Sequence, residues 1–149
     1  MKYQLDDSNI LFLNAGWQEW SQFSNNELAF SGGALNPAVT LDRNWDNTWH
    51  AGVALAHHEN DWGTSIGFSY DSSPVEDKHR TYDLPMDEYY KASFSYFWKG
   101  DKHLDYSIGG TAYLVGDAEI DVTAQGVRAA GEFDTNYLLF LGGSMRYVF

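Results

Sequence analysis

The 149-residue chain contains no cysteine, only three prolines and only nine lysines and arginines. The lack of cysteine excludes disulfides, thiolate metal ligands and a cysteine nucleophile, so it leaves little basis for redox chemistry. The nine cations are scattered among 21 acidic residues, and the formal net charge of -12 would repel a phosphate backbone. We therefore expect no nucleic-acid partner, no cofactor and no metal site.

The sequence also lacks long apolar runs. No stretch approaches the roughly 18 apolar residues that a membrane helix needs. Residues 1–7 contain neither an apolar core nor a small-residue cleavage site, so they do not predict a signal peptide. Transmembrane strands escape a search for apolar runs because apolar and polar residues alternate along them. Aromatic residues make up 17% of the chain and glycine occurs 14 times, which favours strands over helices.

Six segments alternate between apolar residues and small or polar residues with a period of two. They are residues 9–20, 47–58, 62–71, 90–98, 104–114 and 137–149. In residues 62–71, for example, Trp62, Ile66 and Phe68 fall on one face, and glycines and serines occupy the other. Segments of about ten residues are long enough to cross a bilayer at a tilt. The pattern predicts an all-β fold, a transmembrane antiparallel β-barrel with about six strands in this chain.

The connections between these segments are alternately short and long. The long ones are residues 21–44, 72–87 and 116–133, and most of the carboxylates lie in or beside them. Short turns at one end and long polar loops at the other are typical of the periplasmic and extracellular ends of an outer-membrane barrel. We therefore expect the chain to reside in the bacterial outer membrane.

A soluble β-sandwich or a lipocalin-like barrel is the alternative, since its strands also alternate. Its apolar face would be the interior, where isoleucine, leucine and valine should dominate. Here the apolar face ends in aromatic residues near the strand termini, where interfacial girdles belong. These residues are Trp49, Trp62, Tyr70, Tyr90, Trp98 and Tyr147. The pattern favours the membrane barrel.

Three residues with a charge or a potential charge fall on the small and polar face: His50, Lys91 and Arg146. In a narrow lumen such residues are paired or line a pathway, and the sequence is consistent with both roles. His50 could also serve a hydrolase together with Ser65 or Ser69 on the next strand, but no nucleophile motif accompanies them. We therefore interpret the chain as a non-enzyme.

Four blocks of sequence carry a resemblance to a known family. They are Trp-Gln-Glu-Trp-Ser-Gln-Phe at 17–23, Trp-Asp-Asn-Thr-Trp at 45–49, Gly-Phe-Ser-Tyr-Asp-Ser-Ser-Pro-Val at 67–75, and His-Arg-Thr at 79–81 followed by Leu-Pro at 84–85. In order and spacing they resemble the FadL/TodX outer-membrane hydrocarbon transporters, and the resemblance covers residues 6–149. It implies uptake of long-chain fatty acids or other hydrophobic molecules.

The resemblance also implies a fourteen-stranded barrel plugged by an N-terminal hatch, of which this chain supplies the last six strands. Residues 1–149 would form a single C-terminal barrel segment without the hatch or a signal peptide. Six strands leave two unpaired edges, which lipid cannot satisfy. Either a missing N-terminal portion completes the wall, or two copies join at both seams into a twelve-stranded barrel.

The same family places an inward basic residue near the start of the strand at Trp45, where it meets the ligand carboxylate. Leu41 stands close to the expected place, and Arg43 is a nearby substitute. The alternative is that Arg43 pairs with Asp42 or Asp46 in a solvated loop, where such a pair contributes little. The predicted ligand-binding residues are Arg43, His50, Lys91 and Arg146.

Two functions remain open on these grounds. The first is a conduit whose partners are hydrophobic small molecules and the outer-membrane lipid. The second is a structural or receptor module that binds partners through its long acidic extracellular loops.

Overall fold

The computed structural model of the chain describes residues 1–28, 39–81, 86–100, 103–124 and 127–147. One antiparallel sheet dominates it, with the strand order β1-β2-β5-β6-β7-β8-β11. The strands are β1 (Lys2–Gln4), β2 (Asn9–Gln18), β5 (Thr48–His58), β6 (Trp62–Asp71), β7 (Tyr89–Lys99), β8 (Leu104–Val115) and β11 (Asn136–Tyr147). The six long strands match the six segments predicted from the sequence, and the all-β prediction is confirmed.

The pairing register keeps the two faces of the sheet distinct across all six long strands. Phe68 of β6, for example, lies opposite Val53 of β5 and Ala92 of β7. We call the face that carries these side chains the belt face and the opposite one the lumen face. On the belt face, Phe68 is 63% exposed, and Phe94 is 50% exposed. A soluble sandwich would bury such residues, whereas a barrel wall presents them to lipid.

Aromatic residues border the belt face at both ends. At the end with the long connections, the Tyr70 ring lies 4.9 Å from that of Trp49 and 5.0 Å from that of Tyr90. At the other end, neighbouring ring centroids are 5.3 to 6.0 Å apart along a row of four residues. That row consists of Trp62, Tyr96, Trp98 and Tyr106.

The distance between the two girdles fits a membrane. Trp62 and Tyr70 are eight residues apart on β6. At about 3.3 Å per residue and a tilt of about 40°, the separation is roughly 20 Å along the membrane normal, close to the apolar band of about 25 Å in outer-membrane barrels. The girdles therefore frame the belt face where the polar interfaces of a bilayer belong.

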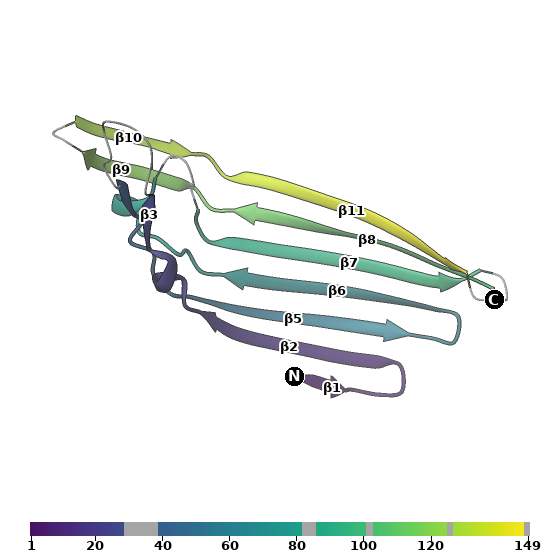
Figure 1. Cartoon of the computed structure of the whole chain (residues 1–149). Helices are drawn as coiled ribbons and strands as arrows, with labels where there is room; N and C mark the ends of the chain where they lie inside the picture. The colour runs from purple at the N-terminus through teal and green to yellow at the C-terminus, as the bar shows by residue number, and fades with distance from the viewer. Residues whose placement is uncertain (29–38, 82–85, 101–102, 125–126, 148–149) are drawn as a thin grey trace.

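The long connections contain regular structure that the sequence interpretation treated as loop. They contain two hairpins, β3 (Asn25–Leu28) with β4 (Val39–Asp42) and β9 (Ala118–Ala124) with β10 (Val127–Phe133). Two 3-10 turns, η1 (Trp20–Phe23) and η2 (Asp77–His79), accompany them. All four elements gather at one end of the sheet (Figure 1). No helix in the described residues is long and apolar enough to cross a membrane.

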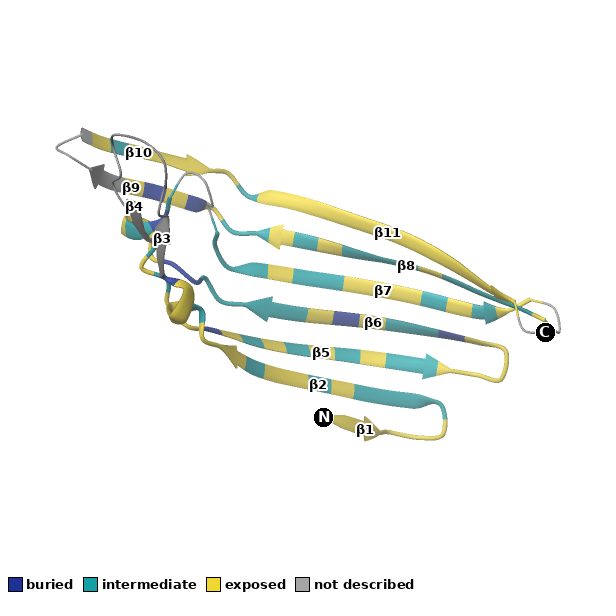
Figure 2. Cartoon of the chain, in the orientation of Figure 1, coloured by how far each residue is buried: buried dark blue, intermediate teal, exposed yellow. Residues whose placement is uncertain are grey.

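Deep burial is confined to a few places. Most strand residues are half-buried or exposed (Figure 2). The buried apolar side chains, Val75, Ala118 and Ile120, lie at the end with the long connections, around the buried side chain of Arg80. The edges of the sheet are β1 and β11. The described residues thus form an open, curved wall and not a closed globule.

Candidate functional site

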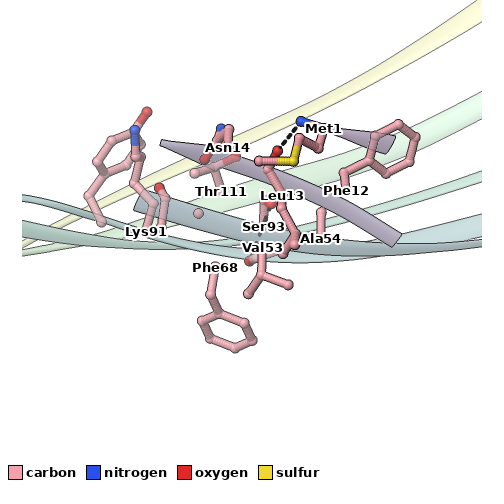
Figure 3. A pocket seen from close by; sticks show the side chains of 14 residues that line it. Met1, Phe12, Leu13, Asn14, Val53, Ala54, Phe68, Lys91, Ser93 and Thr111 are labelled. Atoms are coloured by element: carbon pink, nitrogen blue, oxygen red, sulfur yellow. Dashed lines mark hydrogen bonds between the residues drawn. The ribbon is translucent and has the colours of Figure 1, made fainter. Parts of the chain in front are cut away.

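A hollow of about 520 Å³ lies over the lumen face near the middle of the sheet. The side chains of Asn14, Lys91, Ser93 and Thr111 point to this side, whereas Phe68 points to the other (Figure 3). Two rows of the register pass through the hollow. They are Phe12-Ala54-Gly67-Ser93-Thr111-Phe140 and Asn14-Gly52-Ser69-Lys91-Tyr113-Leu138. Because Ala54, Gly67 and Ser93 of the first row and Gly52 and Ser69 of the second are small, the sheet leaves room for a ligand there.

Lys91 stands at this hollow as part of an ion pair. It lies directly opposite Ser69 on β6, and its Nζ reaches diagonally to Asp71, 3.3 Å from Oδ2. A diagonal neighbour on the same face is within reach of a long side chain. The rings of Tyr89 and Tyr113 flank the ammonium, with centroids 5.2 Å and 5.9 Å from Nζ. Lys91 thus meets the hollow already paired with a carboxylate.

Asp71 is the more buried partner of this pair. Its side chain is 13% exposed, against 29% for Lys91. Asp71 Oδ2 is buried and accepts no hydrogen bond of normal geometry, although the Lys91 ammonium lies close to it. The hydroxyl of Tyr89 is within hydrogen-bonding reach of the same carboxyl group. The charge of Asp71 therefore depends on Lys91 for its compensation.

His50 lies one row nearer the long connections, between Gly16 on β2 and Asp71 on β6. Its imidazole covers Gly16, because a Cβ at that position would stand 2.3 Å from His50 Cε1. The ring thus extends toward β2 and away from Ser69 and Asp71. This placement does not form the serine–histidine contact that a hydrolase requires.

Arg146 lies at the opposite end of the lumen face. Its Nε donates to Asp105 Oδ2 at 3.0 Å, and the pair borders a smaller hollow of about 340 Å³ together with Phe97 and Lys99. Lys99 shares a row with Asp105 and Arg146, and it follows Lys91 by eight residues on β7. At about 3.3 Å per residue, Arg146 is roughly 26 Å from the row of Lys91. The two cations therefore belong to different sites.

Arg43 lies among the long connections, after the end of β4 and before the start of β5. Its Nη1 donates to Thr81 Oγ1 at 3.2 Å, and its guanidinium stands 5.5 Å from the ring centroid of Trp45. Its backbone N–H donates to the Ser24 carbonyl at 2.7 Å. Of the four predicted residues, Lys91 and His50 lie near each other on the lumen face. Arg146 lies at the far end of this face, and Arg43 lies among the long connections beyond its other end.

Arg80 is a second cation of the loop end, and only its place in the His-Arg-Thr block distinguishes it in the sequence. Its side chain is 1% exposed. It donates from Nε to the Met86 carbonyl at 2.8 Å, from Nη1 to Asp77 at 2.7 Å and to the Glu119 carbonyl, and it pairs with Asp87 at 3.1 Å. Arg80 thus joins the connection after β6 to strand β9.

Exposed ion pairs set the charge of the surface around this loop end. The Lys78 ammonium holds the pKa of Glu76 below its usual value through a hydrogen bond and charge attraction, and Glu76 in turn raises the pKa of Lys78. In the β9–β10 hairpin, the hydrogen-bonded Arg128 lowers the pKa of Asp121. Of the 21 acidic residues, only Asp71 and Asp105 lie in the six long strands.

An open antiparallel sheet with an apolar belt between two aromatic girdles, and small residues on its other face, defines a wall segment of a transmembrane β-barrel. The family described as outer membrane protein transport protein (OMPP1/FadL/TodX) matches residues 1–147, and the chain belongs to this family. The family and the outer-membrane localisation predicted from the sequence are thereby confirmed. The family is one of transport proteins, which agrees with the interpretation of the chain as a non-enzyme.

Comparison with solved structures supports the same fold. The chain is similar to a Pseudomonas aeruginosa FadL homologue of known crystal structure, with a TM-score of 0.84 and 24% sequence identity. The match covers 98% of this chain and 34% of that protein, so the chain spans about a third of the homologue's length. A search among curated proteins finds no match.

Proposed function

We propose that this chain forms the C-terminal wall of an outer-membrane transporter that takes up long-chain fatty acids or other hydrophobic molecules. The hollow on the lumen face is the observation that carries this proposal. It combines an apolar wall at Phe12 with small residues that leave space and with one ion pair at its side. Further strands, from a preceding part of the protein or from a second copy, complete the barrel around it.

The physical basis of binding is the transfer of an alkyl or aromatic body from water into this hollow. Burying one methylene group contributes about 0.8 kcal/mol, so a chain of several carbons binds without strong polar contacts. Polar groups then fix the orientation of the ligand. We assign that role to Lys91 and His50. Arg146 is too far from Lys91 to meet the same head group, and we assign it a structural role in its pair with Asp105.

The test uses the assembled barrel in detergent and an uncharged fluorescent hydrophobic molecule as the probe. Ser93→Trp places a large ring in the hollow from the centre of β7. Ala92→Trp is the matched control, since it adds the same ring to the next residue on the belt face. We expect Ser93→Trp to weaken binding at least about tenfold, the equivalent of roughly two buried methylenes, and Ala92→Trp to bind like the unmodified protein. Equal affinities of the two variants would refute the conduit.

A second candidate function, a surface receptor or structural module, is favoured by one observation. The loop end contains ordered hairpins and the buried Arg80, and nearly all acidic residues lie outside the long strands. Replacing the β9–β10 hairpin with a short turn separates the two functions. If the chain is a receptor, the variant loses the binding of its protein partner and still binds the probe. If the chain is only a conduit, the variant binds the probe as before, and neither protein binds a partner.

A further inference from the structure

We propose that Asp71 is a specificity-determining residue of the hollow, which neutralises Lys91 and thereby favours ligands with uncharged head groups over carboxylates. This inference rests on the proposed function, because it concerns the ligand that the hollow accepts. It narrows the ligand class to hydrophobic molecules that end in a hydroxyl, carbonyl, ester or aromatic group.

The first step concerns the charge available to a ligand. Of the described side chains that line the hollow, Lys91 alone carries a positive charge. The two other cations of the long strands lie at the far end of the lumen face, where Lys99 is 3.8 Å from Asp61 and Arg146 is paired with Asp105. The α-amino group of Met1 also borders the hollow and donates to the Leu13 carbonyl. Among the side chains, a ligand carboxylate in the hollow would therefore depend on Lys91 for its charge partner.

The second step concerns the free-energy cost that arises when a ligand carboxylate takes Lys91 away from Asp71. Lys91 Nζ lies 3.3 Å from Asp71 Oδ2, and this oxygen is buried without a hydrogen bond of normal geometry. A carboxylate beside Lys91 would place a second negative charge next to Asp71, and it would draw the ammonium away from a carboxylate oxygen that is buried. A buried charge that loses its partner is strongly disfavoured.

An uncharged head group avoids this conflict. The neutral pair keeps its internal attraction, and the remaining N–H groups of Lys91 can donate to a hydroxyl or carbonyl oxygen of the ligand. The rings of Tyr89 and Tyr113 beside the ammonium offer an apolar surface for the part of the ligand next to its head group. The pair then orients a ligand that carries no charge.

The experiment compares dodecanol with dodecanoate at a mildly alkaline pH, each displacing an uncharged fluorescent probe from the assembled barrel. We expect the unmodified protein to prefer dodecanol. In Asp71→Asn, Lys91 loses its partner, so dodecanoate should bind about tenfold more tightly while dodecanol changes less than about twofold. Asp105→Asn, which removes the aspartate of the distant pair, is the matched control and should change neither affinity.

A double variant keeps the test decisive if Asp71→Asn assembles poorly. Lys91→Met with Asp71→Asn removes both charges together, so neither is left alone. We expect both ligands to lose the hydrogen bond from Lys91, and we expect the preference for dodecanol over dodecanoate to stay as in the unmodified protein, because the pair was already neutral. A fall in dodecanoate affinity that clearly exceeds the fall in dodecanol affinity in this variant, or unchanged dodecanoate affinity in Asp71→Asn, overturns the assignment. If the unmodified protein binds neither ligand, the proposed function itself fails.

Discussion

The guanidinium of Arg80 lies 3.1 Å from the carboxylate of Asp87. Both residues belong to the connection between β6 and β7, and Arg80 also donates to the backbone carbonyl of Glu119 in β9. Because the Arg80 side chain is almost fully buried, this arrangement joins two long connections into one unit. We call this unit, formed by the described residues around Arg80 at the loop end of the sheet, the cap.

Arg80→Ala should open this cap without unfolding the membrane strands. The substitution leaves the carboxylates of Asp77 and Asp87 and three backbone carbonyls without this donor. Removing one partner of a buried ion pair costs about 3 kcal/mol or more. We expect faster amide hydrogen exchange in the β9–β10 hairpin and protease cleavage within residues 72–81. Arg128→Ala removes an exposed arginine from the same hairpin. It should leave residues 72–81 uncleaved and should change the exchange in the hairpin much less than Arg80→Ala does. Equal protection in Arg80→Ala and the unmodified protein would contradict the role of this residue.

The Asp121–Arg128 pair makes a prediction about pH. The hydrogen bond from Arg128 lowers the pKa of Asp121 below its reference value of 3.8. A carboxyl group whose pKa is lowered on folding stabilises the hairpin above that reference value, and the contribution disappears as the pH falls through the lowered pKa. Titration of the Asp121 carboxyl carbon by NMR should show this low value, and Arg128→Gln should return it toward 3.8. Identical titration curves would show that the two side chains do not interact in solution.

A close contact on the lumen face allows a double-mutant test of the packing near the short turns. A Cβ at Gly63 would stand 2.2 Å from Phe97 Cε1, because the Phe97 ring lies across the glycine. Gly63→Ala should destabilise the barrel by about 1–2 kcal/mol, since overpacking displaces the ring. In a Phe97→Ala background the same substitution should cost less. Urea unfolding from lipid vesicles measures the coupling, and additive effects of the two substitutions would show that the contact is absent.

Alternation predicted the long strands and their faces because, in a strand that separates lipid from a lumen, every second side chain faces lipid and is apolar while the others face the lumen. Ile66 and Phe68 against Ser65 and Gly67 illustrate this, and the observed bounds of β6 equal the predicted ones. The sequence interpretation also expected a strand over residues 9–20, whereas β2 ends at Gln18 and a 3-10 turn begins at Trp20. Strand ends are harder to predict because aromatic residues occur both at interfaces and in loops.

The ion pair at the hollow, the β9–β10 hairpin and the burial of Arg80 could not be predicted, because they depend on the strand register and on contacts between residues that are distant in the sequence. Lys91 was predicted as a lumen residue, but its partner Asp71 is a diagonal neighbour that becomes visible only when β6 and β7 are aligned. The β9–β10 hairpin escaped notice among the acidic residues around it, although Ala118 and Ile120 alternate as a buried strand face. The burial of Arg80 could not be predicted, since its partners come from three separate positions along the chain.

Depth in the bilayer should determine the cost of a charge on the belt face. Ile66 lies midway between Trp62 and Tyr70 on β6, and Thr64 lies two residues nearer to the girdle at Trp62. Ile66→Arg should reduce the free energy of folding into bilayers by about 2–4 kcal/mol, the cost of arginine near the midplane, and Thr64→Arg should cost less. Folding titrations into lipid vesicles measure both values. Equal costs at the two positions would place the bilayer elsewhere on the sheet.

Spin labels along β6 test most directly which face of the sheet meets lipid. Because the chain has no cysteine, single cysteines introduced at positions 64 to 69 each give one defined labelling site. In membranes, we expect labels at 64, 66 and 68 to be accessible to oxygen dissolved in lipid, and labels at 65, 67 and 69 to be shielded from it. Accessibility without this alternation, or with the two sets exchanged, would contradict the assignment of the belt and lumen faces.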